Sequence, residues 1–268
     1  MRLIKILAVF LLPVVLLVPS GCGDSDNPIK VGLPGNNPDP WAGLPAITPE
    51  MVANADFDNS EPGLMALWYG DELLASGALF ARFRDRLKEV RETYGGSIPE
   101  ANITFQFPYK VGKLLIQLSE EAAAEFRAGT YTEWDSLNTL FGVTSIDTSV
   151  LFTDCNCVSL HFKGQLHPKY LAEYYRPLAG VILCEPNGYG GDWSNMYPWL
   201  VEGKVTFLAR DAWGDCPSGC LNSHFFYFRE NDQGGMDYIG SWLTGFEVES
   251  EPEPEWWAEA RAAYDFYR

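Results

Sequence analysis

Residues 113–121, which read KLLIQLSEE, decide the fold. After Lys113, residues 114–118 form a short apolar run broken by one glutamine, which predicts a strand over residues 113–118. Ser119 follows in the position of a helix N-cap, and Glu120 and Glu121 occupy the first turn, where the helix dipole favours anions. A strand that passes directly into a helix is therefore predicted, and Gly129 is expected to break that helix.

The segment from residue 113 to residue 187 continues to alternate strands and helices. After the glycine break, the pattern predicts a second helical piece, two strands, another helix and a last strand, at Trp134–Leu140, Ser145–Phe152, Cys157–Phe162, Pro168–Leu178 and Val181–Cys184. The resulting order, β-α-β-β-α-β, is the split βαβ motif of ferredoxin-like folds. Right-handed crossovers would place both helices on one face of the sheet.

Shorter units are predicted on both sides of this segment. On its N-terminal side we expect a strand, a helix and a strand at Leu64–Trp68, Gly77–Thr93 and Ile103–Phe107. On its C-terminal side, residues 204–243 predict an antiparallel meander that extends or covers the sheet, with strands at Lys204–Asp211, Leu221–Arg229 and Met236–Trp242. Together these units predict one α+β globular domain over residues 62–246.

Residues 1–21 have the pattern of a signal peptide. Arg2 and Lys5 precede an uncharged run from Leu7 to Val18, which gives a basic region followed by an apolar region. The run is shorter than the membrane span of about 20 residues that a transmembrane helix needs. The sequence therefore predicts that the chain is exported.

The residues that follow resemble the lipobox of bacterial lipoproteins. Residues 18–22 read VPSGC, although Pro19 stands where that family usually has leucine. The resemblance implies cleavage before Cys22, a lipid on its thiol and a place in the cell envelope. Gly23 favours the outer membrane if the cell is Gram-negative, and an ordinary signal peptide with a chance cysteine is the alternative. The turn Asp215–Cys220 is likewise similar to one in a family of exported lipoproteins of unknown activity.

The chain beyond the lipobox begins with a segment that contains few core residues and ends with an acidic, aromatic tail. Residues 22–61 are rich in proline, glycine and asparagine, so they bury too little apolar surface to offset their ordering and predict a flexible tether. Residues 247–268 begin as an acidic stretch and continue as an aromatic segment that predicts a short helix. This tail either packs on its own domain or binds a partner.

Five cysteines follow the lipobox, and an oxidising compartment would pair them. Cys216 and Cys220 enclose a Pro-Ser-Gly turn that brings their thiols together, so a disulfide is predicted there. A metal half-site formed by these two residues with Cys155 and Cys157 is the alternative. Of Cys155, Cys157 and Cys184, at most two can pair with each other, which leaves one thiol free.

A second resemblance concerns the end of the β-α-β-β-α-β segment. Leu178, the pair Gly180-Val181 and the run 185–187, EPN, resemble the close of subtilisin-type propeptides and related inhibitor domains. In that family the domain docks on a protease, and the chain after the last strand enters the protease cleft. The catalytic blocks of those proteases do not follow, so the chain is not a protease precursor. The resemblance implies a partner-contact loop at Gly188, Tyr189, Gly190, Gly191 and Asp192.

Composition and motifs argue against several classes of function. The formal net charge is −17 and no basic patch stands out, which argues against nucleic acid as a partner. The sequence has no zincin motif, nucleophile elbow, P-loop or calcium loop, so no catalytic residue, metal or cofactor is predicted. Its histidines fall on two strands and at a helix start, at His161, His224 and His167.

The sequence therefore predicts an exported, membrane-anchored binding or protease-inhibitor-like module rather than an enzyme. Its expected partners are the membrane, through the lipid on Cys22, and an exported protease or another envelope protein. A structural envelope protein and a carboxylate-dependent hydrolase are the alternatives, the latter because acidic residues are plentiful. Trp193, Tyr197 and Trp199 could stack on sugar rings, although core packing is the commoner role of such residues.

Overall fold

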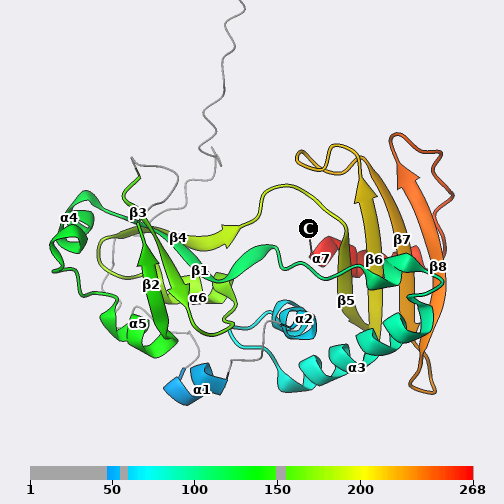
Figure 1. The fold of residues 1–268 in the computed structure, drawn as a ribbon, viewed down its shortest axis with the longest axis horizontal. Helices are drawn as coiled ribbons and strands as arrows, with labels where there is room; N and C mark the ends of the chain where they lie inside the picture. Colours follow the sequence, from blue (N-terminus) through cyan, green and yellow to red (C-terminus); the bar gives the residue numbers. More distant parts are fainter. Residues whose placement is uncertain (1–46, 55–59, 149–154, 268) are drawn as a thin grey trace, which may run out of the picture. The chain divides into compact units, whose positions relative to one another are not determined.

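The chain is an α+β protein built on two antiparallel β-sheets (Figure 1). The computed structural model describes residues 47–54, 60–148 and 155–267. Each sheet has four strands, and every neighbouring pair is antiparallel. The predicted signal peptide, residues 1–21, and the predicted lipidation site Cys22 lie outside the described residues. None of the helices in the described ranges combines the length and hydropathy that a membrane span requires.

The first sheet contains the strand that decides the fold. Its strands are β1 (Tyr109–Leu118), β2 (Val143–Asp147), β3 (Cys157–Phe162) and β4 (Val181–Gly188). Their spatial order is β2-β3-β1-β4, so that β1 lies between β3 and β4. The helices that connect them are α4 (Glu120–Ala128), α5 (Asp135–Phe141) and α6 (Pro168–Tyr175).

Local chemistry explains how β1 passes into α4. The Ser119 side chain accepts a hydrogen bond from the Ala122 backbone N–H at 3.2 Å, which caps the helix. Glu120 and Glu121 lie in the first turn, and Gly129 ends the helix with a φ of +74°. This junction has the caps that the sequence predicts.

The corner between α6 and β4 depends on Gly180. Its φ is +78°, and a Cβ at this position would lie 2.4 Å from the Cβ of Ala122. The Gly180 carbonyl also accepts a hydrogen bond from the Ser119 N–H at 2.8 Å. Only glycine adopts such a φ freely and leaves room for this approach. The Gly180-Val181 pair, which carries part of the resemblance to inhibitor domains, is thus explained by packing.

The second sheet is a meander with four strands rather than three. Its strands are β5 (Asn195–Val201), β6 (Lys204–Trp213), β7 (Asn222–Glu230) and β8 (Met236–Gly245). β5 is not predicted from the sequence, because proline is unusual inside a strand. Pro198 is tolerated because β5 lies at the edge of the sheet, where one side of the strand needs no ladder partner. The meander forms a separate sheet, so of the two expected arrangements it does not take the one that extends the first sheet.

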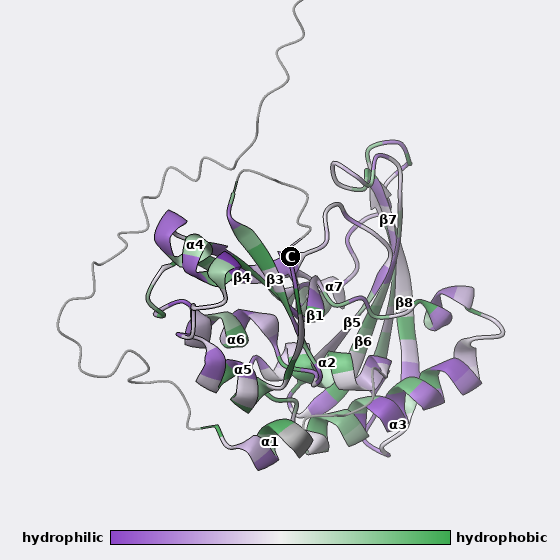
Figure 2. Cartoon of the chain, turned by 60° about the vertical axis from the view of Figure 1, so that its left-hand side comes forward, coloured by the Kyte–Doolittle hydropathy of each residue, from purple (hydrophilic) through white to green (hydrophobic). Residues whose placement is uncertain are grey.

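The predicted N-terminal strand at Leu64–Trp68 is wrong, because these residues belong to helix α2 (Glu61–Gly70). A short apolar run cannot separate a buried strand from a buried helix. Pro62 in the first turn and the left-handed Asp71, with a φ of +46°, mark the two ends of α2. Figure 2 shows α2 largely in green, whereas the predicted helix α3 (Gly77–Tyr94) displays both green and purple.

Residues 103–107, also predicted as a strand, form no strand in the structure. The 3₁₀ helix η1 precedes them (Pro99–Asn102). Burial alternates along the segment, but side chains take the place of a partner strand. The Phe105 N–H donates to Glu61 Oε1 at 2.6 Å, and the Gln106 N–H donates to Asn195 Oδ1 at 2.7 Å. An extended segment packed on one side thus gives the same pattern as a strand.

Both faces of the second sheet are covered by packed side chains. Residues 225–228, which read FFYF, are all buried. Phe226 and Phe228 pack in a cluster with residues of α2 and α3, whereas Phe225 and Tyr227 pack in a cluster with residues of the C-terminal helix. A strand that is buried on both faces has a continuous apolar run instead of an alternating one.

The C-terminal tail belongs to the domain and is not a separate segment. Helix α7 (Trp257–Phe266) packs on the second sheet, where the Trp257 ring lies 4.7 Å from that of Phe225. Before the helix, the Glu251 N–H donates to the Leu243 carbonyl of β8 at 2.9 Å. Of the two arrangements expected for the tail, the structure thus shows the one in which it packs on its own domain.

The range predicted as a tether also contains a packed element. Helix α1 (Pro49–Asn54) falls within residues 22–61, and Val52 is buried in the core of the first sheet. The expectation of a tether that continues to residue 61 was wrong for this part. The tether was predicted from the average composition of residues 22–61, and most of the prolines and glycines in this range lie before the helix.

His167, just before α6, is fully buried among aromatic rings. Its ring stacks on Trp68 with centroids 5.3 Å apart, and Phe107 and Tyr170 approach it edge-on. Neither ring nitrogen has a hydrogen-bond partner within the described residues. Burial lowers the pKa of His167 to about 4, so the imidazole is neutral at neutral pH.

Acidification is expected to destabilise the protein through His167. The pKa of this histidine is about 6.5 in the unfolded chain and about 4 in the folded chain. Between these two pH values, the unfolded chain therefore binds more protons than the folded chain. Stability should therefore fall as pH drops through this window, by about 3 kcal/mol in all. Urea unfolding over this range should show the loss in the wild type and lack it in His167→Phe. Equal pH slopes for the two proteins would contradict the prediction.

Candidate functional site

The loop that the sequence proposes for partner contact connects the two sheets. Gly188 is the last residue of β4, and the chain then runs to the start of β5. Tyr189 is 55% exposed, and Gly190 and Gly191 are exposed as well. Asp192, by contrast, is half-buried. The loop therefore has an exposed tip and one end that is packed into the protein.

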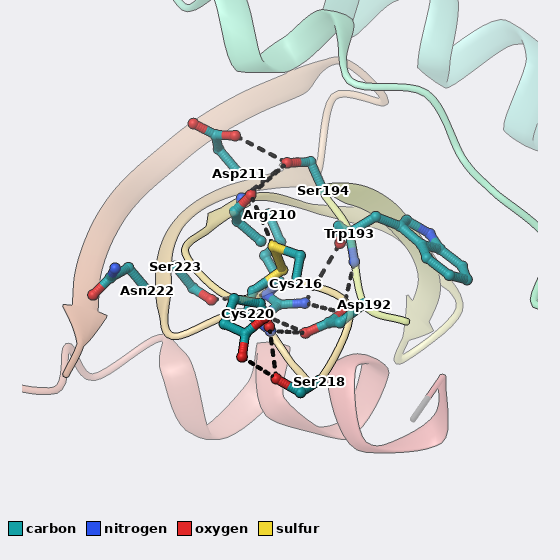
Figure 3. The surroundings of a disulfide bond; sticks show 12 residues. Asp192, Trp193, Ser194, Arg210, Asp211, Cys216, Ser218, Cys220, Asn222 and Ser223 are labelled. Carbon is teal, nitrogen blue, oxygen red and sulfur yellow. Dashed lines mark hydrogen bonds and ion pairs between the residues drawn. A yellow bond between two sulfur atoms is a disulfide. The ribbon is translucent and has the colours of Figure 1, made fainter. Parts of the chain in front are cut away.

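An ion pair between Asp192 and Arg210 of β6 fixes this end of the loop (Figure 3). Arg210 Nη1 donates to Oδ1 of the carboxylate at 2.6 Å, and Nη2 donates to Oδ2 at 2.8 Å. The Arg210 side chain is only 2% exposed, and its Nε donates to Ser223 Oγ at 2.8 Å. Its guanidinium lies 5.5 Å from the ring centroid of Tyr264. Paired hydrogen bonds of this kind are stronger and more directional than a single charged contact.

The carboxylate of Asp192 is ionised and already neutralised. Burial alone would raise its pKa, but hydrogen bonding and the charge of Arg210 outweigh burial, so the pKa lies below its usual value. Backbone N–H groups of Trp193 and Cys220 donate to the same carboxylate at 2.9 and 3.2 Å. Asp192 is therefore a structural anchor of the loop, and only the tip of the predicted contact loop is available to a partner.

A disulfide holds the anchor from the other side. The structure joins Cys216 and Cys220, the pair that the sequence predicts, across the turn between β6 and β7. The Asp192 N–H donates to the Cys216 carbonyl at 2.8 Å, and the Cys220 N–H donates to the Asp192 carboxylate. The disulfide-closed turn and the contact loop are thus locked together (Figure 3).

Removing the Cys216–Cys220 disulfide is expected to destabilise the protein by about 2 kcal/mol. The loss frees a short loop in the unfolded chain and loosens two backbone bonds to Asp192. Urea unfolding of Cys216→Ser/Cys220→Ser measures the stability, and hydrogen exchange measures the Asp192 amide, which should exchange faster. The control is Cys155→Ser/Cys157→Ser, which should leave that amide unchanged. Wild-type stability in the first variant would refute the prediction.

A pocket of about 280 Å³ lies beside the packed end of the loop. It is lined by the segment before β1, the loop, β5 and the end of α7, through Gln106, Pro108, Tyr189, Gly191, Asp192, Trp193, Asn195, Tyr197 and Tyr267. A second pocket of about 310 Å³ shares Gln106 and Tyr189 with it. Because two residues line both, the pockets adjoin each other.

Two aromatic side chains form the walls of the first pocket. The ring centroids of Tyr189 and Trp193 are 6.3 Å apart, and their planes meet at 86°. Figure 3 shows the Trp193 ring pointing away from the ion pair of Asp192 and Arg210. The Lys110 ammonium lies 5.5 Å from the centroid of the Tyr189 ring. The rings of Tyr189 and Trp193 thus lie beside the ion pair and the disulfide but take no part in either.

Polar contacts between distant segments build the rest of the pocket. Asn195 accepts from the Gln106 N–H at 2.7 Å and donates to the Gln106 carbonyl at 3.2 Å. The Tyr267 hydroxyl donates to the Pro198 carbonyl at 2.9 Å. Burial raises the pKa of Tyr197 to about 12 and that of Tyr267 well above its usual value, so both hydroxyls are protonated at neutral pH.

The three aromatic residues considered for sugar stacking have different fates. Trp193 and Tyr197 line the pocket, but Tyr197 is only 4% exposed and belongs to the core as well. Trp199 lies elsewhere, with its ring centroid 5.2 Å from that of Tyr69 and 5.0 Å from that of Phe266. Of the three, only Trp193 joins Tyr189 as a wall.

The other cysteines form a second disulfide and one buried thiol. Cys155 pairs with Cys157, while Cys184 is free and burial raises its pKa to about 12. Cys157 lies opposite Gln117 of β1, and Cys184 lies opposite Ile116. Because adjacent residues of a strand face opposite sides of the sheet, Cys157 and Cys184 cannot meet. The four cysteines of the alternative metal half-site are paired, and the described ranges hold no metal-binding group of His, Cys, Asp or Glu.

The histidines are spread over the fold. His161 lies on β3, His167 precedes α6, and His224 lies on β7. None of them lines the pocket beside Tyr189 and Trp193. The arrangement of the described residues around the pocket is therefore one of aromatic surface and hydrogen-bonding groups.

Comparison of the chain with protein-family models, curated proteins and solved structures gives no match. The residues of the site give an ordered pocket with two aromatic walls, an amide side chain at Gln106 and a carboxylate whose charge is neutralised within the protein.

Proposed function

We propose that this chain is an exported, lipid-anchored binding module whose binding site is the pocket between Tyr189 and Trp193. The observation that carries the proposal is that two aromatic side chains, the exposed Tyr189 and the half-buried Trp193, line a pocket beside an ion pair and a disulfide that hold the loop. A site that is ordered before it meets its ligand loses less entropy on binding. Aromatic surface with a few fixed polar groups is typical of ligand sites.

The pocket can be tested by NMR with three probes of different chemistry, namely choline, a proline-rich peptide and an oligosaccharide. We expect at least one of them to shift the indole resonance of Trp193, identified by the Trp193→Phe variant, and Tyr189→Ala to weaken that shift. The indole of Trp213, which is 38% exposed and outside the pocket, is the matched control and should not move. If no probe moves the Trp193 resonance, the proposed binding site is wrong.

The lipid anchor on Cys22 is proposed from the signal peptide and the lipobox resemblance. Two disulfides within the described residues support it indirectly, because disulfides persist outside the cytoplasm. In bacteria grown with labelled palmitate, the wild-type protein should take up label and sediment with membranes. The Cys22→Ser variant should carry no label, and label in this variant would refute the assignment.

A protease-inhibitor-like role is the second candidate. The strand order β2-β3-β1-β4 supports a ferredoxin-like split βαβ unit, which the inhibitor domains also have. Tyr189, directly after β4, is exposed where the resemblance implies contact with a protease. The anchor at Asp192 limits this contact to the tip of the loop, because the chain beyond it is held by Arg210.

An inhibition assay distinguishes this second role from the first. The purified protein should slow a subtilisin-type protease at stoichiometric excess, and Tyr189→Ala should relieve the inhibition. Ile239→Ala is a matched control, since Ile239 is 43% exposed on β8, away from the loop. A protease that keeps full activity would exclude the inhibitor role and leave the binding module in place.

A further inference from the structure

We infer that the ligand of this pocket is a neutral oligosaccharide. The inference rests on the proposed function, because it names the ligand class of the same site. Three properties of the pocket lead to it: the two aromatic side chains that line it, the absence of uncompensated negative charge on the described lining residues, and the second pocket that adjoins the first.

The aromatic walls suit a ligand with C–H groups on its faces. An aromatic ring carries partial negative charge on its face, which attracts weakly positive C–H groups. Sugar rings present such C–H groups on their faces and hydroxyls around their edges. Tyr189 is 55% exposed, and its ring stands at 86° to that of Trp193, so a sugar ring can pack on one wall and touch the other.

Charge separates a sugar from the other ligands that aromatic pockets bind. Quaternary ammonium ligands favour aromatic cages, where negative charge assists them. Of the described residues that line the pocket, Asp192 alone is charged, and Arg210 neutralises it through two hydrogen bonds. Lys110, 5.5 Å from the Tyr189 ring, adds a positive charge that repels a cation. A neutral ligand therefore fits the charges around the pocket better than a cationic ligand does.

Polar groups near the walls can meet the hydroxyls of a sugar. Gln106 is exposed and lines both pockets, so its side-chain amide can donate and accept hydrogen bonds. The Lys110 ammonium can donate to hydroxyl oxygens beside Tyr189. A purely apolar ligand would cover these groups without replacing their bonds to water, which carries a cost in free energy.

The two adjoining pockets favour a ligand longer than one sugar ring. They measure about 280 and 310 Å³ and share Tyr189 and Gln106 as lining residues. A chain of linked sugars can therefore place one ring in each pocket, with Tyr189 in contact with both. Tyr109, which is half-buried, extends the aromatic surface in the second pocket.

Calorimetric titration with chitotriose, cellotriose and maltotriose tests the inference on the purified full chain. We expect at least one of these sugars to bind with a Kd below about 1 mM. Tyr189→Ala and Trp193→Ala should each raise that Kd about tenfold or more, because each removes one wall. Trp213→Ala, at an exposed tryptophan outside the pocket, is the matched control and should keep the wild-type Kd.

The outcomes separate this inference from the proposed function. If none of the three sugars binds but choline or the proline-rich peptide shifts the Trp193 resonance, the sugar is wrong and the binding site stands. If no probe of any class binds, both fail. If a sugar binds with equal affinity to the wild type and both wall variants, the pocket is not its site, and the inference is overturned.

Discussion

Replacing Arg210 with alanine is expected to destabilise the protein by about 4 kcal/mol. The change leaves the Asp192 carboxylate without the partner that neutralises its charge. This is costly because the Asp192 side chain is only 21% exposed. It also removes the hydrogen bond to Ser223 and the packing of a side chain that is only 2% exposed. Urea unfolding at neutral pH measures the loss, and the Trp193 indole resonance should shift because the loop end is released.

A second ion pair gives the control for this variant. Arg261 and Asp265 pair on the surface of α7, and both side chains are 61% exposed. Arg261→Ala should cost less than about 0.5 kcal/mol, because water screens such pairs. Adding Asp192→Asn to Arg210→Ala should restore part of the stability, since it removes the stranded charge. A loss below about 1 kcal/mol in Arg210→Ala would mean that the pair does not hold the loop.

Replacing Trp257 with alanine is expected to cost about 4 kcal/mol. The Trp257 side chain is 5% exposed, and its ring centroid lies 4.7 Å from that of Phe225 and 4.6 Å from that of Trp242. Its loss leaves a cavity between α7 and the second sheet, which the neighbouring rings can fill only in part. The change in the free energy of unfolding, from urea titration, checks the value.

A tryptophan outside the core provides the comparison. Trp213, at the end of β6, is 38% exposed, so Trp213→Ala should cost about 1 kcal/mol or less. If Trp257→Ala were as mild as Trp213→Ala, α7 would contribute little to the domain. The tail would then be free for a partner, which is the role that the sequence left open.

The parts of the fold that were predicted correctly are those whose signals are local. Ser119 caps α4 with its own side chain, and Gly129 ends that helix, so a few neighbouring residues suffice. The strand predicted at Leu64–Trp68 is wrong because five apolar residues fit a buried helix equally well, and Pro62 marks the start of such a helix. β5 was missed because its tolerance of Pro198 depends on its place at the sheet edge.

The candidate site was predicted only in outline. The exposed tip at Tyr189 was found through a family resemblance, and Trp193 was named for its aromatic ring. Arg210 was missed, since its bond to Asp192 joins residues 18 positions apart and follows no sequence motif. Asn195 was missed for the same reason, because it meets Gln106 across 89 positions. Such contacts arise from the tertiary arrangement, and no periodicity in the sequence predicts them.

The positions of Cys157 and Cys184 on either side of β1 bear on how the protein acquires its covalent links. Once β1 lies between β3 and β4, the sheet separates these two sulfurs, so thiol exchange cannot join them. A bond between Cys157 and Cys184 is therefore open only to a chain in which this sheet has not formed. Folding thus keeps the buried thiol of Cys184 away from Cys157.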